Sequence, residues 1–299
     1  MDTERTIAII GAGKVGLAIG ILAAKARLRV VAVADRNAKR AAAAAQRIGP
    51  DVRACSRAED AAAAGQLVLL TVSDDAIEPL CARLAQAGAF FAGTAVAHCC
   101  GALGSEALAP ARDAAGCHVG TMHPLQTFAT VDSALAKLPG AHCFIEGDAD
   151  AVDALAGLAE AIGALPVAMP AGNRALYHAA AVMACNYLTA LLDAAAGLAE
   201  TAGVNREQYL RAVEPLVRAT VDNVFAMGPA DALTGPVERG DIRTIERHLD
   251  ALAAGDEKLA AFYRAAGKWT VALARRKGSI DPSVAQAIER ALNGESGKE

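Results

Sequence analysis

The sequence predicts a doubly wound α/β sheet followed by an all-helical domain, and three observations predict it. A short apolar run that begins at Thr6 leads directly into a G-x-G-x-x-G motif, Gly11 to Gly16. Apolar, strand-like runs then alternate with Ala-rich, helix-like segments to about residue 168. Beyond Pro170 the pattern is helical only. We therefore expect a Rossmann dinucleotide-binding domain at residues 1–169 and a helical domain at residues 170–299.

Each glycine of the motif has a mechanical role. Gly11 permits the tight turn from strand to helix, Gly13 lets the backbone approach a pyrophosphate, and Gly16 lets the next helix pack closely on the strand. That helix, expected over Leu17–Ala26, offers unpaired N–H groups and a positive dipole end to the phosphates. The predicted pyrophosphate-binding residues are Gly11, Ala12, Gly13, Lys14, Val15 and Gly16.

The residues after the second apolar run leave the dinucleotide open between NAD and NADP. Asp35, nineteen residues after Gly16, would bind the ribose hydroxyls of NAD and repel a 2′-phosphate. Asn37 could serve either dinucleotide. A basic group could hold the 2′-phosphate of NADP or form the solvated first turn of a surface helix: Arg36, Lys39 and Arg40. S-adenosylmethionine also binds a Gly-rich loop followed by an acid, and is a less favoured alternative.

Further patterns predict the remaining elements. Strands are expected at Val30–Ala34, Leu67–Val72, Thr94–His98, Cys117–Met122, Cys143–Glu146 and Leu165–Met169. Helices are expected at Ala38–Ile48, Ala76–Ala87, Asp150–Ile162 and Arg174–Ala202, the last ending at Gly203. Later helix starts are indicated by Asn205 with Gln208, by Asp241 and by Asp281 before Pro282.

Composition and charge exclude several classes of protein. A length of 299 residues allows two domains, and a net charge of −4 with both signs interspersed indicates no nucleic-acid surface. The apolar stretch Ala179–Leu192 contains Asn186 and is followed by Asp193, which argues against a membrane span. Seven cysteines without a C-x-x-C spacing argue against a disulfide framework or a structural zinc site. The N-terminus lacks the order of a signal peptide, so we expect a cytoplasmic protein.

Three strand ends carry reactive side chains at the edge of the sheet where ligands bind, and the third contains His123. Val72, Ser73 and Asp74 could line the nicotinamide ribose, although capping of the next helix is the favoured interpretation of this segment. Cys100 and Gly101 could contact substrate. An inert or weakly polar role is favoured for the Cys100 thiol, because a reactive cysteine needs a lowered pKa.

His123 is the predicted proton-transfer residue. It follows an apolar strand and precedes Pro124, which would hold the imidazole at the rim of the sheet beside a nicotinamide ring. Hydride transfer to or from a carbon that bears oxygen or nitrogen needs a proton donor or acceptor, and histidine titrates in the useful range. The alternative is that His123 caps the following turn. Gln126 lies in the same segment and is a predicted substrate contact.

Polar residues of the helical part complete the predicted site. His178 and Asn186 are eight residues apart on the long helix and roughly share a face, so they are expected to line a substrate cleft. Arg239 could bind a substrate carboxylate. Asp241 could contact substrate or merely cap a helix.

In combination these segments resemble a family of bacterial Rossmann-like oxidoreductases of undefined function, described as similar to deazaflavin-dependent NADP oxidoreductases. The resemblance covers nearly the whole chain and rests on the glycine motif and four further segments: Val72–Ile77, His123–Phe128, Tyr177–Ala180 and Leu233–Asp241. The wider group, similar to 6-phosphogluconate dehydrogenase, implies a helical dimerisation domain, a cleft between the domains and a homodimer. His123-Pro124 resembles the His-Pro step that carries the proton-relay histidine of prephenate dehydrogenases.

The chain departs from the resemblance at two positions. The family usually has Ser-Gly where this chain has Cys100-Gly101, and the β-hydroxyacid enzymes have a lysine where this chain has Val182. His123 or His178 would therefore have to move the proton.

We expect an NAD(P)-dependent oxidoreductase that transfers hydride to or from a small, anionic metabolite at the interdomain cleft. The expected catalytic residues are His123, His178 and Asn186. The alternative from another class is a non-catalytic NAD(P)-binding sensor or scaffold, and a methyltransferase is less favoured.

Overall fold

A computed structural model describes residues 5–253 and 255–295. The chain forms two compact units, Met1–Asn186 and Tyr187–Glu299, so that their boundary falls within helix α8 (Arg174–Thr201). The expected boundary at residues 169 and 170 coincides with the end of the last strand rather than with this division.

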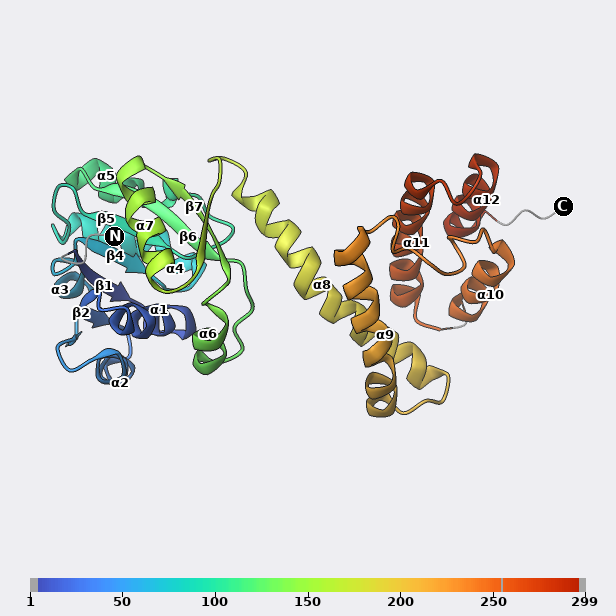
Figure 1. Ribbon diagram of the computed structural model, residues 1–299, viewed down its shortest axis with the longest axis horizontal. Helices are drawn as coiled ribbons and strands as arrows, with labels where there is room; N and C mark the ends of the chain where they lie inside the picture. The colour runs from blue at the N-terminus through green and yellow to red at the C-terminus, as the bar shows by residue number, and fades with distance from the viewer. Residues whose placement is uncertain (1–4, 254, 296–299) are drawn as a thin grey trace. The chain divides into compact units, whose positions relative to one another are not determined.

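The first unit is built on an eight-stranded sheet with the order β3-β2-β1-β4-β5-β6-β7-β8 (Figure 1). The strands are β1 (Thr6–Ile10), β2 (Arg29–Ala34), β3 (Arg53–Cys55), β4 (Leu67–Leu70), β5 (Ala95–His98), β6 (His118–Pro124), β7 (His142–Gly147) and β8 (Leu165–Ala168). The order reverses at β1, which places the switch point of a doubly wound sheet between β1 and β4. The expected fold class is confirmed.

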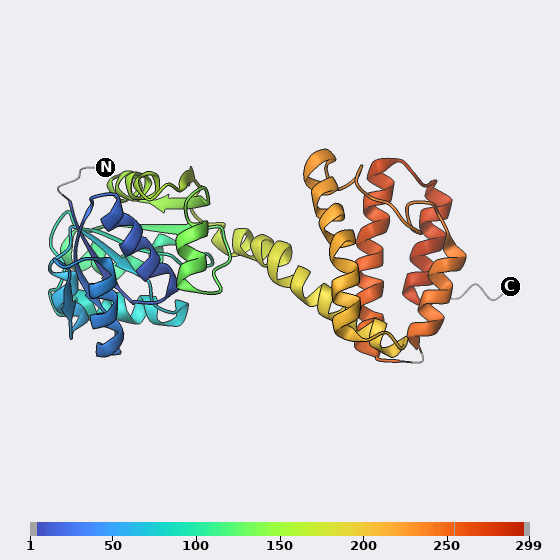
Figure 2. The ribbon, with the colours of Figure 1, turned by 60° about the horizontal axis from the view of Figure 1, so that its bottom comes forward.

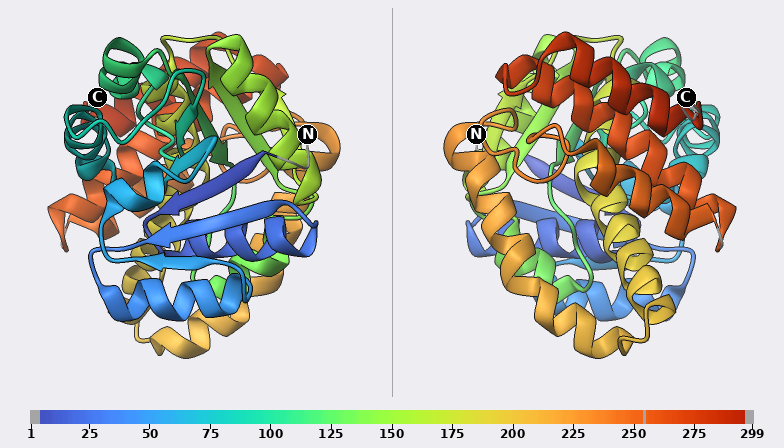
Figure 3. Two further views of the ribbon diagram at one scale, coloured as in Figure 1. Left: turned by 90° about the vertical axis from the view of Figure 1, so that its left-hand side faces the viewer. Right: turned by 90° about the vertical axis from the view of Figure 1, so that its right-hand side faces the viewer.

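Helices cover both faces of this sheet (Figure 3). Alternate residues of β1 show the division, because Ile7 and Ile9 belong to one buried core while Ala8 and Ile10 belong to the other. The first core packs under α1 (Lys14–Lys25), α2 (Ala38–Ile48), α6 (Val131–Lys137) and α7 (Ala149–Ala161). The second packs under α3 (Ala58–Ala62), α4 (Asp74–Gln86), the short 3-10 helix η1 (Ser105–Leu108) and α5 (Ala109–Ala115).

Two features of the first unit differ from the sequence-based expectation. Strand β7 runs antiparallel to β6, whereas every other pair in the sheet is parallel. Short elements were also missed, namely β3, α3, α5 and α6. Each has seven residues or fewer, which is too short for a periodic pattern to separate a helix or strand from a loop.

The second unit contains the rest of α8 and the helices α9 (Arg206–Met227), α10 (Ile242–Ala253), α11 (Glu257–Lys277) and α12 (Pro282–Asn293) (Figure 2). Its core forms where α10, α11 and α12 meet around Ile245, Val271 and Ile288. The expected caps are confirmed: the side chain of Asn205 accepts from the Gln208 N–H at 3.1 Å, and Pro282 occupies the first turn of α12. Helix α11 was not expected from the sequence.

Helix α8 is long and apolar enough to cross a membrane by length and composition alone, with a mean hydropathy of 1.4 in its most apolar window. The sequence-based argument against a span, which rested on Asn186 and Asp193, is therefore weaker than expected. Core helices of soluble proteins pass the same test when they are mostly buried, but only 6% of this window is buried. The first residue of α8, Arg174, is itself buried and donates to Thr121 of the sheet. The residues at the start of the chain, used for the signal-peptide argument, include positions 1–4, which lie outside the described residues.

Candidate active site

The glycine motif forms a close-packed turn at the carboxyl end of β1. Gly11 has a φ of +105°, and a Cβ there would lie 2.5 Å from the carbonyl oxygen of Thr71. A Cβ on Gly16 would overlap the Thr71 hydroxyl and the Gly11 carbonyl. The roles predicted for these two glycines, a tight turn and close packing, are therefore confirmed. A Cβ on Gly13 would meet nothing nearer than 4.0 Å, so this residue faces open space at the start of α1.

A pocket of about 590 Å³ opens beside this turn, at the carboxyl ends of β1, β2 and β4. Several predicted cofactor-binding residues line it: Gly11, Gly13, Asp35, Arg36, Arg40, Val72 and Ser73. The segment after β3 and helix α4 contribute charged residues that the sequence did not indicate: Arg57, Glu59 and Arg83. The pocket is thus lined both by glycines of the motif and by four arginines, Arg36, Arg40, Arg57 and Arg83.

Asp35 is already engaged by the protein. One carboxylate oxygen accepts from the Ala12 N–H at 2.9 Å, the other accepts from the Asn37 N–H at 2.8 Å, and Arg40 lies 3.7 Å away. Its side chain is only 6% exposed. The carboxylate therefore ties the glycine motif to the end of β2, and Arg40 offsets its charge. Asn37 caps α2 by accepting from the Arg40 N–H at 3.2 Å.

The expectation that Ser73 and Asp74 cap the next helix needs correction. Ser73 occupies the N-cap position of α4, but its side chain makes no capping hydrogen bond, and Asp74 is already the first residue of the helix. Ser73 instead lines the pocket, next to Val72.

The turn after β5 is built around inward-facing polar side chains. Cys100 is buried, and its sulfur accepts from the N–H groups of Ala102 at 3.3 Å and Leu103 at 3.4 Å. Burial raises the pKa of the Cys100 thiol, and Asp74 raises it further, which agrees with the favoured inert role. His98 is fully buried and accepts from the Cys100 N–H at 3.2 Å through Nδ1, which leaves Nε2 to donate to the Gly104 carbonyl at 3.1 Å.

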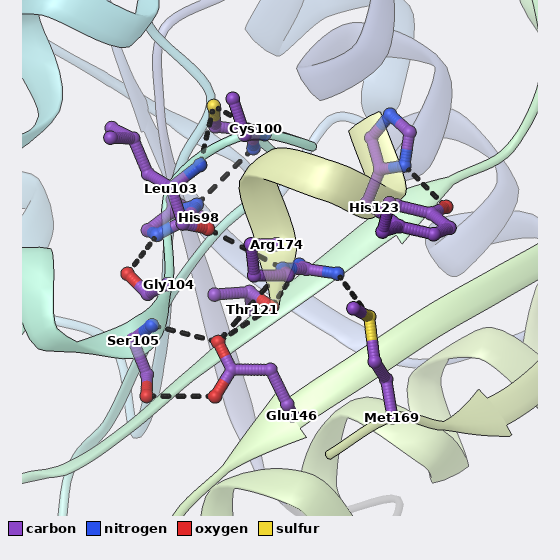
Figure 4. Close-up of polar contacts among 12 residues, drawn as sticks. His98, Cys100, Leu103, Gly104, Ser105, Thr121, His123, Glu146, Met169 and Arg174 are labelled. Atoms are coloured by element: carbon purple, nitrogen blue, oxygen red, sulfur yellow. Dashed lines mark hydrogen bonds and ion pairs between the residues drawn. The ribbon is translucent and has the colours of Figure 1, made fainter. Parts of the chain in front are cut away.

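His123 lies at the centre of an aromatic cluster. It belongs to β6, where it pairs with Phe144 of β7, rather than following the strand as expected. Its Nδ1 is 2.9 Å from the Tyr177 hydroxyl, and its ring meets those of Tyr177 and His178 edge to face, with centroids 5.6 and 5.9 Å apart. A Cβ on Gly101 would lie 2.8 Å from His123 Nε2. The hydrogen bond of His123 thus goes to α8, and not to the turn that follows it (Figure 4).

Both partners of the His123–Tyr177 hydrogen bond are uncharged near neutral pH. The pKa of His123 is lowered to about 4, first by burial and then by the charges of Arg174 and His178, with Asp74 opposing them. Burial raises the pKa of Tyr177 to about 12. A neutral imidazole that shares one ring nitrogen with a hydroxyl can accept or donate a proton at the other nitrogen, depending on its tautomer.

The structure leaves other predicted residues apart from this cluster. Asn186 is exposed on α8, about 12 Å beyond His178 along the helix at 1.5 Å per residue. Gln126 is exposed, and its side chain accepts from the Thr127 N–H at 2.8 Å. In the second unit Arg239 is exposed, while Asp241 caps α10 by accepting from the N–H of Thr244 at 3.1 Å and from its hydroxyl at 2.7 Å. Their roles toward substrate stay predictions.

Tyr177, Arg174 and Glu146 are the polar residues that sequence reasoning left without a role. Arg174 and Glu146 are buried charges, 3% exposed each, and Tyr177 holds His123. The spacing from Arg174 to Tyr177 and His178 was an available signal, since residues three and four apart share a helix face. The contacts that join Arg174 and Tyr177 of α8 to residues of β6 could not be predicted from the sequence.

Two protein-family models match the chain. A Rossmann-like domain matches residues 2–124, and a domain of unknown function, DUF2520, matches residues 141–270. No curated protein matches the chain in sequence.

Solved structures share its fold. A Bacteroides fragilis protein whose name proposes an NADP oxidoreductase is 20% identical, with a TM-score of 0.66 over 93% of this chain and 99% of that one. An imine reductase from a Pseudomonas species is 18% identical, with a TM-score of 0.62 over 96% and 99% of the two chains. A reductive aminase from Aspergillus terreus, solved with NADPH and ethyl-5-oxohexanoate, is 16% identical, with a TM-score of 0.60 over 97% and 93%.

Proposed function

The chain joins a Rossmann-like domain to a DUF2520 domain, and from that premise we propose that it is an NADP-dependent oxidoreductase in which His123 transfers the proton. The observation that carries the proposal is the His123–Tyr177 hydrogen bond of 2.9 Å. It lies at the same edge of the sheet as the glycine motif, three strands along in the order β1-β4-β5-β6. Strands spaced by about 4.8 Å put His123 about 14 Å from the motif, so a cofactor extended along this edge would bring its reactive ring toward the imidazole.

The arginines that line the pocket support NADP over NAD. The Asp35 carboxylate accepts two backbone N–H groups and is offset by Arg40, so its repulsion of a 2′-phosphate is reduced. Arg36 and Arg57 also line the pocket, Arg57 with its Nε 3.6 Å from Glu59, and their guanidinium groups can donate to phosphate oxygens. The reductive aminase of similar fold was solved with NADPH, which agrees with this choice.

The bound nicotinamide would supply or accept the hydride, and the protein's own residues would handle the proton. When Tyr177 donates to His123 Nδ1, the Nε2–H group can donate to a substrate oxygen or nitrogen. When His123 Nδ1–H donates to Tyr177 instead, Nε2 is a base. A pKa near 4 leaves the imidazole uncharged at neutral pH, so Nε2 would accept the proton in substrate oxidation, and Nε2–H, with Tyr177 donating to Nδ1, would give it in substrate reduction.

The substrate would be a small molecule with a carbon–oxygen or carbon–nitrogen bond to oxidise or reduce. Neighbours of similar fold are named imine reductase and reductive aminase, and these names suggest carbonyl compounds and imines as first candidates. An anionic substrate remains a proposal that rests on the exposed Arg239.

We also propose a homodimer. Most of the large apolar side chains that are exposed lie on α8, α9 and α11, among them Leu176, Met183, Phe225 and Trp269, which are 74%, 60%, 86% and 68% exposed. Exposed apolar surface on this scale is typical of an interface. Light scattering of the purified protein should give twice the mass of 30.4 kDa, and a monomer at micromolar concentration would contradict the dimer.

The first test is calorimetric titration with NADPH, NADH and S-adenosylmethionine, followed by a screen for NADPH oxidation with 2-oxo acids, ketones and cyclic imines. Selective NADPH binding together with turnover is the expected result. NADPH binding without turnover over a broad panel would favour the sensor or scaffold. Binding of S-adenosylmethionine alone would favour a methyltransferase, and the absence of nicotinamide binding would end the proposal.

A further inference from the structure

We propose that Arg174 is a positioning residue of this site, and that with Glu146 it holds α8 and the turn after β5 on either side of the His123 imidazole. The inference rests on the proposed function for its consequence in catalysis. The positioning itself is a property of the folded protein and can be measured without a substrate.

Arg174 joins three separate segments at the first residue of α8 (Figure 4). Its guanidinium donates to the Leu103 carbonyl at 3.4 Å, to the Met169 sulfur at 3.6 Å and to the Thr121 hydroxyl. These partners belong to the turn after β5, to the segment after β8 and to β6. A planar guanidinium has five N–H donors in a fixed arrangement, so a single side chain can tie all three segments together.

Glu146 completes the network from β7. Its carboxylate lies 4.0 Å from Arg174 Nε and accepts from the Ser105 N–H at 2.7 Å and the Ser105 hydroxyl at 3.0 Å. The Thr121 hydroxyl, 3.4 Å away, is shared with Arg174. A buried ion pair gives little net stability because both charges are desolvated. The network that Arg174 and Glu146 form with their neighbours is therefore better explained by the positions in which it holds α8 and the turn after β5.

The same network controls both sides of His123. On one side Arg174 precedes Tyr177 and His178 by three and four residues, so the three side chains share one face of α8. The guanidinium carbon of Arg174 is 5.7 Å from the centre of the Tyr177 ring. On the other side Leu103, in the turn after β5, and Ser105, the first residue of η1, hold the segment that contains Gly101, where a Cβ would lie 2.5 Å from His178 Cδ2. A shift of Arg174 would therefore loosen the packing of both α8 and the Gly101 turn against the His123 imidazole.

The charge of Arg174 should affect the pKa of His123, which a purely packing role of Arg174 would not. Around His123 the structure places the cation of Arg174, the ring of His178 and the carboxylate of Asp74, and the first two lower the pKa of His123 while Asp74 raises it. Removing the Arg174 charge should therefore raise this pKa. Removing the Glu146 charge leaves Arg174 uncompensated and should move the pKa of His123 down or leave it in place.

The test is an NMR titration of the His123 ring in the full-length protein, for wild type, Arg174→Met, Arg174→Lys and Glu146→Gln. Arg174→Met should raise the pKa of His123 and weaken its coupling to Tyr177, whereas Arg174→Lys should keep the charge and lose the geometry, with a nearly unchanged pKa. In turnover assays both Arg174 variants should lower kcat about tenfold or more with an unchanged Kd for NADPH.

The outcomes separate this inference from the proposed function. Unchanged coupling of His123 to Tyr177 in folded Arg174→Met and Arg174→Lys proteins would overturn the inference, whatever the activity. If Arg174→Met does not fold, Arg174→Lys and Glu146→Gln carry the test, because a rise in the pKa of His123 in Glu146→Gln contradicts the charge arrangement. Weakened coupling in a protein that neither oxidises nor reduces a substrate leaves the positioning supported and counts against the oxidoreductase proposal alone.

Discussion

The two ends of the same sheet edge are built in different ways. The glycine turn comes from one contiguous segment, β1 to β2, and the backbone gives it its shape, since a side chain at Gly11 or Gly16 would collide with Thr71. The His123 cluster is assembled from β6, the turn after β5 and α8, and its key hydrogen bond joins residues 54 positions apart.

This difference predicts different responses to mutation. A backbone turn depends on steric space, so its failures should appear as lost cofactor binding and lost stability. A side-chain cluster held by a buried polar network should fail in proton transfer while the fold and the cofactor site persist.

The largest effect is expected at His123. His123→Ala should lower turnover by about two to four orders of magnitude, because a general acid or base is removed, while the Kd for NADPH stays unchanged. Steady-state rates and calorimetry measure the two quantities. The matched control is His118→Ala on the same strand, whose imidazole pairs with Asp150 at 3.1 Å at the surface and should leave turnover intact. Full turnover of His123→Ala would exclude His123 as the proton-transfer group.

The buried imidazole should also make stability depend on pH. Because folding lowers the pKa of His123 from 6.5 to about 4, the unfolded chain binds a proton more readily, so stability is complete above pH 6.5 and falls as the pH drops toward 4. The loss from this residue would be about 3 kcal/mol at 1.36 kcal/mol per pH unit. Urea unfolding at several pH values should show a smaller loss for His123→Gln than for wild type. The buried His98 is present in both proteins, so equal losses would contradict the shift at His123.

At the other end, Gly11→Ala should act through the backbone. The new Cβ would meet the Thr71 carbonyl at 2.5 Å in a conformation with φ of +105°, at a cost of about 1–3 kcal/mol. We expect a lower unfolding free energy and NADPH binding weakened about 5- to 100-fold. Gly88→Ala is the control, since Gly88 has a φ of +64° but nothing within 4 Å of its Cβ position. Equal effects of the two variants would show that φ alone, and not the close approach, matters.

The same division explains what the sequence could predict. The roles of Gly11 and Gly16, the strand before them and the position of Asp35 follow from local spacing, and the structure has them as expected. The long helix and the Asn205 cap follow from periodicity and capping rules. These features are marked by residue spacing along the chain, which a sequence displays directly, even though the residue that Gly11 and Gly16 pack against is Thr71, after β4.

The partners of His123 could not be predicted in the same way. Its position at the sheet edge was expected, but its bond to Tyr177 depends on how α8 returns to the sheet, and the antiparallel β7 depends on strand pairing across many residues. Asp35 was recognised as a site residue, yet its bond to the Ala12 N–H is visible only in three dimensions. Contacts between distant segments carry little signal in one sequence.

The smallest effect is expected at Arg36, one of the arginines that line the pocket. Arg36→Ala should weaken NADPH binding by about 1 kcal/mol, or roughly five- to tenfold, and leave NADH binding unchanged, because only NADPH carries the 2′-phosphate that a guanidinium would bind. Lys39→Ala is the control, since Lys39 is exposed on α2 and outside the pocket lining. Calorimetry with both cofactors measures the selectivity. A change in NADH affinity as large as that for NADPH would mean that Arg36 supports the shape of the pocket, and the choice between the dinucleotides would then rest on Arg57 and on the compensation of Asp35 by Arg40.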